Sequence, residues 1–455
     1  MSSSAHFTGV VSESHAYQQQ EIPHCLKSCQ SAQAVRANNR HFQLATSSSN
    51  SQSSGGVLLW QIPPTAGAIS RETMYLRCRV TATCAAVPTY ADAANTLTFK
   101  GPGVLGAGVK SDGTATAGAF IPSLSNGFSW IQRLTLYGTG SAVIDQMNYV
   151  NGTMDMLLAH NTSATYLQTE AQALLGIARP WDQAGAGNNA YVDLCLPLPL
   201  SCFNNSAQDF PLYLCKNPLT LQLDLSSFAR AITSGATTGA SDYTVSNAYL
   251  CYEVLEVPHS LIEAERSAVQ GGHPFVMPLQ SWLNVQVPKS VLSSYTLGLN
   301  ASSLRSVFVQ IMDAASYASA TQINYARGAD DSSANWGSGV NAQIYLDGNV
   351  KNSSIFDNPS QQFIQLKQAL HNNIQSSVIQ PSYSNFARYV LQHNALGWDC
   401  TSFDEEATVF GGSSVSNLNI QLTGYSANPT FIGTIMCLYD TLLAFQADGV
   451  MEVRR

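Results

Sequence analysis

The sequence predicts an all-β fold made of two tandem β-sandwiches, and three observations lead to that class. Short runs of β-branched, aromatic and aliphatic residues recur along the chain, separated by Gly, Pro, Asn and Ser. The connections between runs are long and polar, as at 233–244 and 326–340, which favours a sandwich over alternating strands and helices. The order of the runs also occurs twice.

Segment 219–225, LTLQLDL, is the clearest predicted strand. Apolar and polar residues alternate through it, so its leucines share one face and its polar side chains share the other. A period of two is typical of a strand that is buried on one face only.

The repeat is found by aligning LTLQLD from Leu219 with LNIQLT from Leu418. Each is followed by a loop and an apolar strand, NAYLCYEVLEV in the first half and TIMCLYDTLLAF in the second. Upstream, LTLYGTG matches AQIYLDGN, and MYLRCRVTATC matches RSVFVQIMDAAS. We therefore expect one sandwich unit to be duplicated, with the boundary between Pro258 and Pro274.

Two segments have helical rather than strand periodicity. Phe363, Leu366 and Leu370 fall at i, i+3 and i+7 on one helix face, and Asn358 followed by Pro359 is a typical N-cap and first-turn pair. A second helical stripe covers 144–158, although Gly152 weakens or splits that helix. We expect both helices to lie against the sheets.

Composition limits the classes of function. The chain has 455 residues, which predicts two domains or one large one. Apolar residues make up 45%, enough for a sizeable core, whereas charged residues make up only 11%, against about 25% in an average soluble protein. The low content of charged residues excludes a disordered chain and a coiled coil. The net charge of −8 excludes a protein that binds nucleic acid through its overall charge.

Residues 1–55 are rich in Ser, Gln, Asn and Ala, which predicts a flexible arm followed by a linker. Within 1–50, three cationic residues stand against two acidic ones, a net charge of +1. An arm that condenses a genome has to neutralise many phosphates. We expect this arm not to do so.

No segment has the pattern of a membrane-spanning helix or of a secretion signal. The longest nearly apolar stretch, 430–445, contains Asp440, and the first residues have neither a basic region nor an apolar one. The ten cysteines lie mostly within apolar, strand-like runs. We expect buried, reduced thiols in a reducing compartment.

Motifs for catalysis and cofactors are weak. A G-x-G-x-x-G match occurs at Gly101, Gly103 and Gly106, but Pro102 and the residues that follow predict a loop where a dinucleotide site needs a helix. The glycines of 138–140 predict a tight turn.

The densest acidic clusters are at 404–406 and 330–331. Paired carboxylates could hydrolyse glycosides on a β-sandwich, but adjacent acids on a loop more often form a solvated surface or a calcium site. We therefore expect no catalytic, cofactor-binding or metal-binding residues.

A zinc site is the remaining metal hypothesis. His24, Cys25, Cys29 and His41 could supply four ligands, but their irregular spacing favours an arm that docks on a neighbour. The five sequons are expected to be unmodified; they are at Asn151, Asn161, Asn204, Asn300 and Asn352.

Three stretches of the chain resemble the double jelly-roll major capsid proteins of tailless double-stranded DNA viruses, such as polinton-like viruses, virophages and nucleocytoplasmic large DNA viruses. They are SWIQRLTLYGTGSAVIDQMNYVN, FPLYLCKNPLTLQLDLSSF followed by AYLCYEVLEVP, and SSLRSVFVQIMD. The resemblance covers essentially everything after residue 55.

The resemblance implies two tandem eight-stranded jelly rolls with short helices in the loops. The expected division is an arm at 1–55, a first jelly roll at 56–258 and a second at 259–455. It also implies a non-enzymatic protein located in the virion. Three copies would form a pseudo-hexameric capsomer in an icosahedral shell, with minor capsid, penton or cement proteins as partners, often over an internal membrane, and with no sequence-specific nucleic acid.

Other classes give different expectations. A carbohydrate-binding or carbohydrate-cleaving sandwich would expose Trp336 and Trp398 along a groove lined with acids. A secreted adhesin is disfavoured because no signal segment is seen, and a basic-armed RNA capsid is disfavoured by the charge of the arm.

Overall fold

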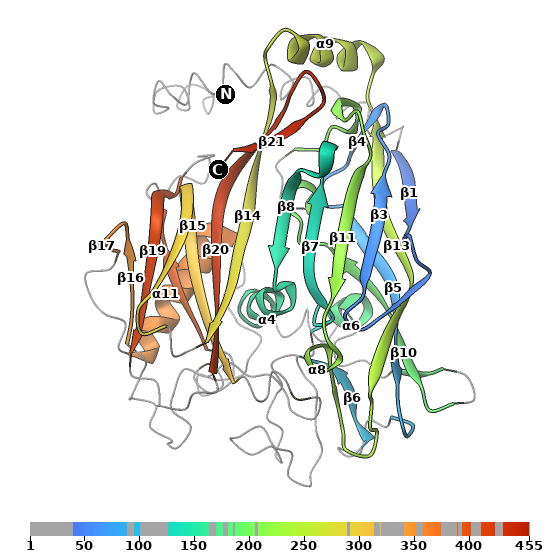
Figure 1. Cartoon of the computed structure of the whole chain (residues 1–455), viewed down its shortest axis with the longest axis vertical. Coiled ribbons are helices and arrows are strands. Elements are labelled where there is room, and N and C mark those ends of the chain that lie inside the picture. Colours follow the sequence, from blue (N-terminus) through green and yellow to red (C-terminus); the bar gives the residue numbers. More distant parts are fainter. Residues whose placement is uncertain are drawn as a thin grey trace, which may run out of the picture.

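The computed structural model describes residues 40–88, 95–100, 126–162, 170–175, 181–184, 187–204, 208–288, 292–313, 319, 341–351, 358–374, 389, 394–401, 411–423 and 431–454. These residues form two β-sandwiches that stand side by side, with helix α9 (His259–Gln270) between them in sequence and at the top of Figure 1. The all-β class predicted from the sequence is confirmed.

The first sandwich has two antiparallel sheets, ordered β1-β13-β5-β10-β9 and β3-β11-β7-β8. The strands of the first sheet, with β2 and β4 pairing β13 beside it, are β1 (Arg40–Thr46), β2 (Ser51–Ser53), β4 (Gly67–Ile69), β5 (Tyr75–Thr83), β9 (Asp182–Gln183), β10 (Ala190–Pro197) and β13 (Asp242–Glu256). The strands of the second are β3 (Val57–Ile62), β7 (Ile131–Tyr137), β8 (Val143–Asn148) and β11 (Leu219–Leu225). A small sheet pairs β6 (Leu97–Phe99) with β12 (Ile232–Ser234).

The second sandwich is hydrogen-bonded into one sheet, ordered β14-β20-β15-β19-β16-β17, with β18 on β15 and β21 on β20. Its strands are β14 (Phe275–Pro288), β15 (Tyr295–Asp313), β16 (Asn341–Leu346), β17 (Asn349–Val350), β18 (Ala395–Asp399), β19 (Ser413–Thr423), β20 (Phe431–Phe445) and β21 (Met451–Arg454).

The order of strand pairing is the same in both sandwiches. The row β1-β13-β5-β10 matches β14-β20-β15-β18, and the row β3-β11-β7-β8 matches β15-β19-β16-β17. Strand β15 occurs in both rows because its first part pairs with β19 and its second part, from Ser306, pairs with β20 and β18. Two four-stranded rows in this arrangement make a jelly roll. The predicted duplication is confirmed, with β11 matching β19 and β13 matching β20.

The prediction that the flexible arm extends to residue 55 is wrong. Residues 40–46 form β1 and pair along their whole length with β13, and 51–53 form β2 on the same strand. The two strands are short and mostly polar, and β1 is an edge strand whose hydrogen bonds come from its partner β13, so local composition gives only a weak signal for this pairing. Residues 1–39 lie outside the described part of the chain.

One predicted helix is confirmed and the other is corrected. Helix α11 (Pro359–Ile374) begins where expected, and Asn358 Oδ1 accepts the backbone N–H of Ser360 at 2.8 Å as an N-cap. The helix expected over 144–158 is instead strand β8 followed by α4 (Val150–Asn161). Tyr149, in the left-handed region with φ 50°, separates the two, and pairing with β7 overrides the helical stripe of β8.

A tight turn joins β7 to β8 in the first jelly roll. The tight turn expected at 138–140 is confirmed as η2 (Thr139–Ser141), where Gly140 has φ 71° and a side chain would be strained.

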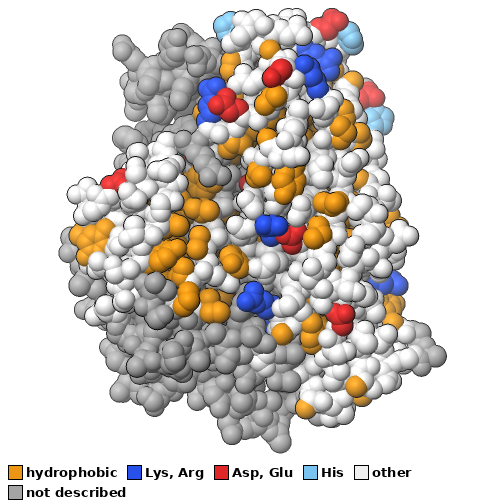
Figure 2. Space-filling view, viewed as in Figure 1, with side chains coloured by type: hydrophobic (Ala, Val, Ile, Leu, Met, Phe, Trp, Pro, Cys, Tyr) orange, Lys and Arg blue, Asp and Glu red, His pale blue; other side chains and the backbone are white. Residues whose placement is uncertain are grey.

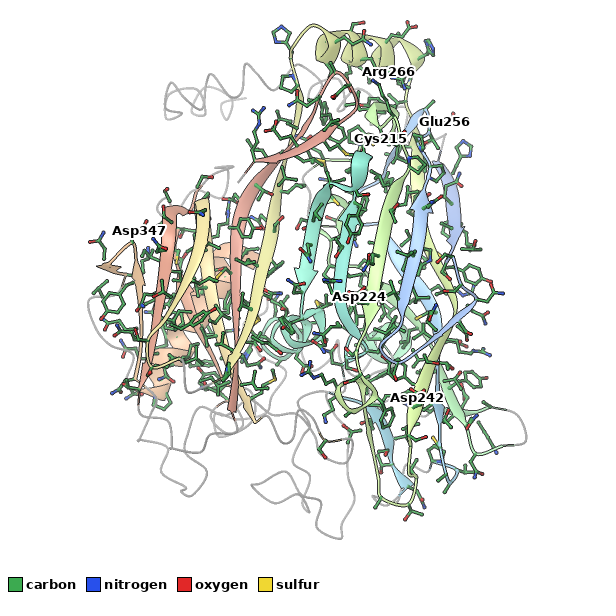
Figure 3. The ribbon with its side chains drawn as sticks, viewed as in Figure 1. Cys215, Asp224, Asp242, Glu256, Arg266 and Asp347 are labelled. Atoms are coloured by element: carbon green, nitrogen blue, oxygen red, sulfur yellow. The ribbon has the colours of Figure 1, made fainter. Side chains whose placement is uncertain are left out.

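Helix α9 is fixed to η3 (Leu212–Leu214) of the first jelly roll. The Tyr213 hydroxyl donates to Glu265, and Arg266, labelled in Figure 3, donates to the Tyr213 carbonyl at 2.7 Å.

The matched strands β11 and β19 give a stability prediction. Leu221 and Ile420 are both fully buried, each in the core of its own jelly roll. Because aspartate at either position would bury an unpaired charge, we expect Leu221→Asp and Ile420→Asp each to lower the free energy of unfolding by about 3 kcal/mol or more in urea titrations. The outward-facing controls, Thr220→Asp and Gln421→Asp, should change it by less than about 1 kcal/mol. Wild-type stability in either core variant would contradict this placement.

Candidate functional site

The two jelly rolls meet at a buried polar contact between β8 and β14. Asp145 of β8 accepts the backbone N–H of Ser201 at 2.8 Å through Oδ2, and the hydroxyl of Ser281 on β14 at 3.4 Å through Oδ1. Ser201, in α7 (Ser201–Asn204), also donates its hydroxyl to the Gln280 carbonyl. Burial raises the pKa of Asp145 to about 6, and these hydrogen bonds oppose the rise.

A second contact joins β14 to the start of α4. The Nδ2 of Asn284 donates to the Asn148 carbonyl at 2.7 Å and to the Thr153 hydroxyl at 2.8 Å. One amide of the second jelly roll therefore binds both the end of β8 and the first turn of α4. Such directional contacts fix how the two jelly rolls are oriented.

Apolar side chains complete the junction. Trp282, Phe308, Met436 and Leu438 lie on the outer face of β14-β20-β15, and all four are buried in the same cluster as Ile144 of β8. The interior of the second jelly roll is a separate cluster. The sequence signal for this double burial is the nearly continuous apolar run of β20, in contrast to the alternation of β11.

Further buried charged groups lie on β20 and after β6. Arg305 donates to Asp440 at 2.6 Å, and the Ser303 hydroxyl donates to the same carboxylate at 2.5 Å. Burial raises the pKa of Asp440 and Arg305 opposes the rise. Lys100, after β6, donates to the carbonyls of Ala229, at 3.1 Å, and Ser319, and burial lowers its pKa to about 7.

The outer face of β1-β13-β5-β10 contains a shallow cavity of about 460 Å³. Leu44, Arg77 and Tyr249 are among its lining residues. Arg79, at its border, binds Asp193 through two hydrogen bonds of 2.8 and 2.9 Å. The lining is therefore mostly polar, with two arginines, an aspartate and an asparagine beside one aliphatic and one aromatic side chain.

The structure separates several candidate residues that the sequence suggested. Trp398 is fully buried in the second core, so it lines no groove. His41 lies on β1 with Nε2 2.7 Å from Glu256 Oε1. Asn151 is buried in α4, where its Nδ2 donates to Ser226 at 3.3 Å.

Other candidates lie outside the described residues. They are His24, Cys25, Cys29, Gly101, Gly103, Gly106, Trp336, Asn352, 330–331 and 404–406. Among the residues that are described, no group of three or more His, Cys, Asp or Glu could hold a metal ion. No described helix has the length and apolarity needed to cross a membrane.

The described cysteines are free thiols, and all but Cys195 are buried. Burial raises their pKa, to about 12 for Cys215 and Cys400. The expected burial is confirmed for the described cysteines other than Cys195. Raised pKa values leave them protonated and poorly nucleophilic.

Comparison with known proteins rests on structure. No protein-family model and no curated protein sequence matches the chain. A chain of the PBCV-1 virus capsid matches at 13% identity and TM-score 0.54, covering 91% of this chain and 96% of that one. The mavirus major capsid protein matches at 11% identity and TM-score 0.51, covering 90% of this chain and 89% of that one. The Faustovirus major capsid protein matches at 9% identity and TM-score 0.52, covering 89% of this chain and 90% of that one. The chain therefore has the double jelly-roll fold of these proteins.

The buried carboxyls predict a pH-dependent stability. Burial raises the pKa of Asp145 to about 6 and that of Asp155, on α4, to about 8, from 3.8. The folded chain therefore binds more protons than the unfolded chain above about pH 4, and the free energy of unfolding falls as pH rises through each window.

We expect Asp145→Asn to flatten the stability profile between about pH 4 and 6 and Asp155→Asn between about pH 4 and 8, by about 1.4 kcal/mol for each pKa unit. Urea titrations at a series of pH values measure this. Gln183→Ala, which changes an exposed side chain of β9 that does not titrate, should leave the profile unchanged. Identical profiles for all three variants would refute the assignment.

The Arg305–Asp440 pair predicts non-additive mutations. Arg305→Leu leaves a buried carboxylate without its cation, so it should lower the free energy of unfolding by about 3–5 kcal/mol. Adding Asp440→Leu should restore most of that loss. A double variant no more stable than Arg305→Leu would argue against a coupled pair.

Proposed function

We propose that the chain is a major capsid protein of a double-stranded DNA virus, and that three copies form a pseudo-hexameric capsomer that tiles an icosahedral shell. The observation that carries the proposal is the duplicated jelly roll, shared with viral capsid proteins over about nine-tenths of the chain. The protein acts by assembly and not as an enzyme, and its location is the virion.

The surface chemistry supports permanent assembly. Only 11% of residues are charged, and on the face in Figure 2 charged side chains are sparse, with one group at the top around α9 and the others scattered singly or in pairs. Charged residues are depleted in the cores of protein interfaces, and obligate interfaces are more apolar still. With a net charge of −8, such a shell encloses its genome without binding it tightly.

The domains of this proposal follow from the strand pairing. The second jelly roll is 259–455, and the first is 56–258 together with β1 and β2 before it. Buried thiols suit assembly in a reducing compartment of the host cell. Minor capsid, penton or cement proteins, and a membrane beneath the shell, are the further partners in this proposal.

Carbohydrate binding is the weaker alternative. It requires exposed tryptophans beside acids, and Trp398 is fully buried. Trp336 and both acidic clusters lie outside the described residues.

The proposal predicts the mass and outline of the purified protein. At micromolar concentration, light scattering should give three times the chain mass of 48.8 kDa. Negative-stain images should show particles of hexagonal outline, because three chains supply six jelly rolls. A stable, monodisperse monomer would contradict the proposal.

A further inference from the structure

Strand β1 forms an open edge of the first jelly roll. It pairs with β13 on one side and ends its sheet, at the right-hand border of Figure 1. Residues 41–44 are all exposed, so both faces of this part of the strand are open among the described residues. The unpaired backbone groups of such a strand are a template for pairing with another chain.

Most other sheet edges in the described part of the chain are short, charged or covered. Strands β9 and β17 have two residues each, and β21 has four, with an ion pair between Glu452 and Arg454 at 3.1 Å. Strands β8 and β14 cover each other at the junction. These are the devices by which proteins prevent unwanted strand pairing, and β1, with seven residues, has none of them over 42–46.

Strand β3 is the other long edge on this side, but it is less open than β1. Every second side chain of β3 lies in the core, and its Leu59 carbonyl accepts the backbone N–H of Ser48 at 2.8 Å. We therefore take β1 as the strand that is available for pairing.

The open edge lies on the side of the first jelly roll that is turned away from the second. The two sheets run from β1 to β9 and from β3 to β8, and β8 is the strand that contacts β14. Figure 1 shows β1 and β3 on the right and the second jelly roll on the left. The second jelly roll of the same chain therefore leaves β1 accessible to another copy.

The surroundings of β1 in the sequence carry no charge. The segment from Phe42 to Ser70, which contains β2, β3 and β4, has no acidic or basic residue and no histidine. Within it, Phe42 and Leu44 are 57% and 46% exposed. Exposed apolar residues without charged neighbours are typical of a protein contact. Because like charges across a contact repel, an uncharged surface is also compatible with a second copy of itself.

The order of side chains along β1 fits pairing with itself. In an antiparallel pair centred on Gln43, Phe42 of one copy stands directly opposite Leu44 of the other, and the reverse. His41 would face Ala45, so the charged start of one strand lies beside the uncharged end of the other. This register therefore joins apolar to apolar residues twice and brings no like charges together.

We propose that two copies of the chain pair their β1 strands in antiparallel register about Gln43 and join their first sheets into one continuous sheet. The contact is isologous, because both copies use the same strand about a twofold axis. It goes beyond the proposed function, since it joins two chains whether or not each belongs to a trimer. Because seven residues from each copy make a small contact, the association should be weak and should form at high protein concentration.

Disulfide trapping tests this register. In a chain with Cys25→Ser and Cys29→Ser, Gln43→Cys puts the new thiol opposite its own copy, where directly opposed Cβ atoms are about 5 Å apart. Mild oxidation with copper phenanthroline should give a covalent dimer on a denaturing, non-reducing gel. Thr46→Cys is the matched control. Because position 46 is three residues from the axis, its two copies lie roughly 20 Å apart and should stay unlinked.

A charge variant tests the apolar pairs. Added to Gln43→Cys, Phe42→Lys/Leu44→Lys sets like charges opposite each other and should lower the yield of covalent dimer at least about tenfold. Val350→Lys/Ile364→Lys changes two similarly exposed apolar residues of the second jelly roll and should leave the yield unchanged. Circular dichroism and thermal unfolding should show that all variants are folded.

Three outcomes would overturn the strand pairing. They are no covalent dimer above the background of the parent chain, equal yields at positions 43 and 46, and an undiminished yield in Phe42→Lys/Leu44→Lys. Light scattering of the wild type reports the trimer of the proposed function independently of trapping. A trimeric wild type without trapped dimer would overturn the pairing alone, and a trapped dimer of a wild type that forms no trimer would overturn the proposed function alone.

Discussion

The second jelly roll has a sheet that is apolar on both faces, and much of the architecture depends on covering it. Ile435 and Cys437 face the core of the second jelly roll, while Met436 and Leu438 face the first. Each apolar face must be removed from water, at about 25 cal/mol for each Å² buried. The second jelly roll therefore needs a neighbour, and the first supplies it through β8 and α4.

Polar groups at this junction restrict how the neighbours pack. An apolar contact alone tolerates sliding, whereas Asp145 and Asn284 reach their partners only in one arrangement. Burial penalises the Asp145 carboxylate and raises its pKa, so this specificity has an energetic cost. Within the second jelly roll, Arg305 and Ser303 offset the energetic cost of burying the Asp440 carboxylate in an apolar strand.

Duplication gives this packing rule a consequence for assembly. The chain holds two similar units, and β8 and α4 of the first contact β14 of the second through Asp145 and Asn284. The low content of charged residues fits such a molecule, because surface that is covered by another copy needs few charges.

The sequence alone determined the all-β class, the duplicated order of strands and helix α11 with its Asn358 cap. Each of these follows from local patterns: period two in β11, repeated order, and helical spacing after an N-cap. Only the tertiary structure decided that β1 is a strand, that β8 is not a helix, and which sheet faces are covered. Edge pairing and face-to-face burial are set by partners distant in sequence, and a local pattern of apolar residues does not record which partner removes them from water.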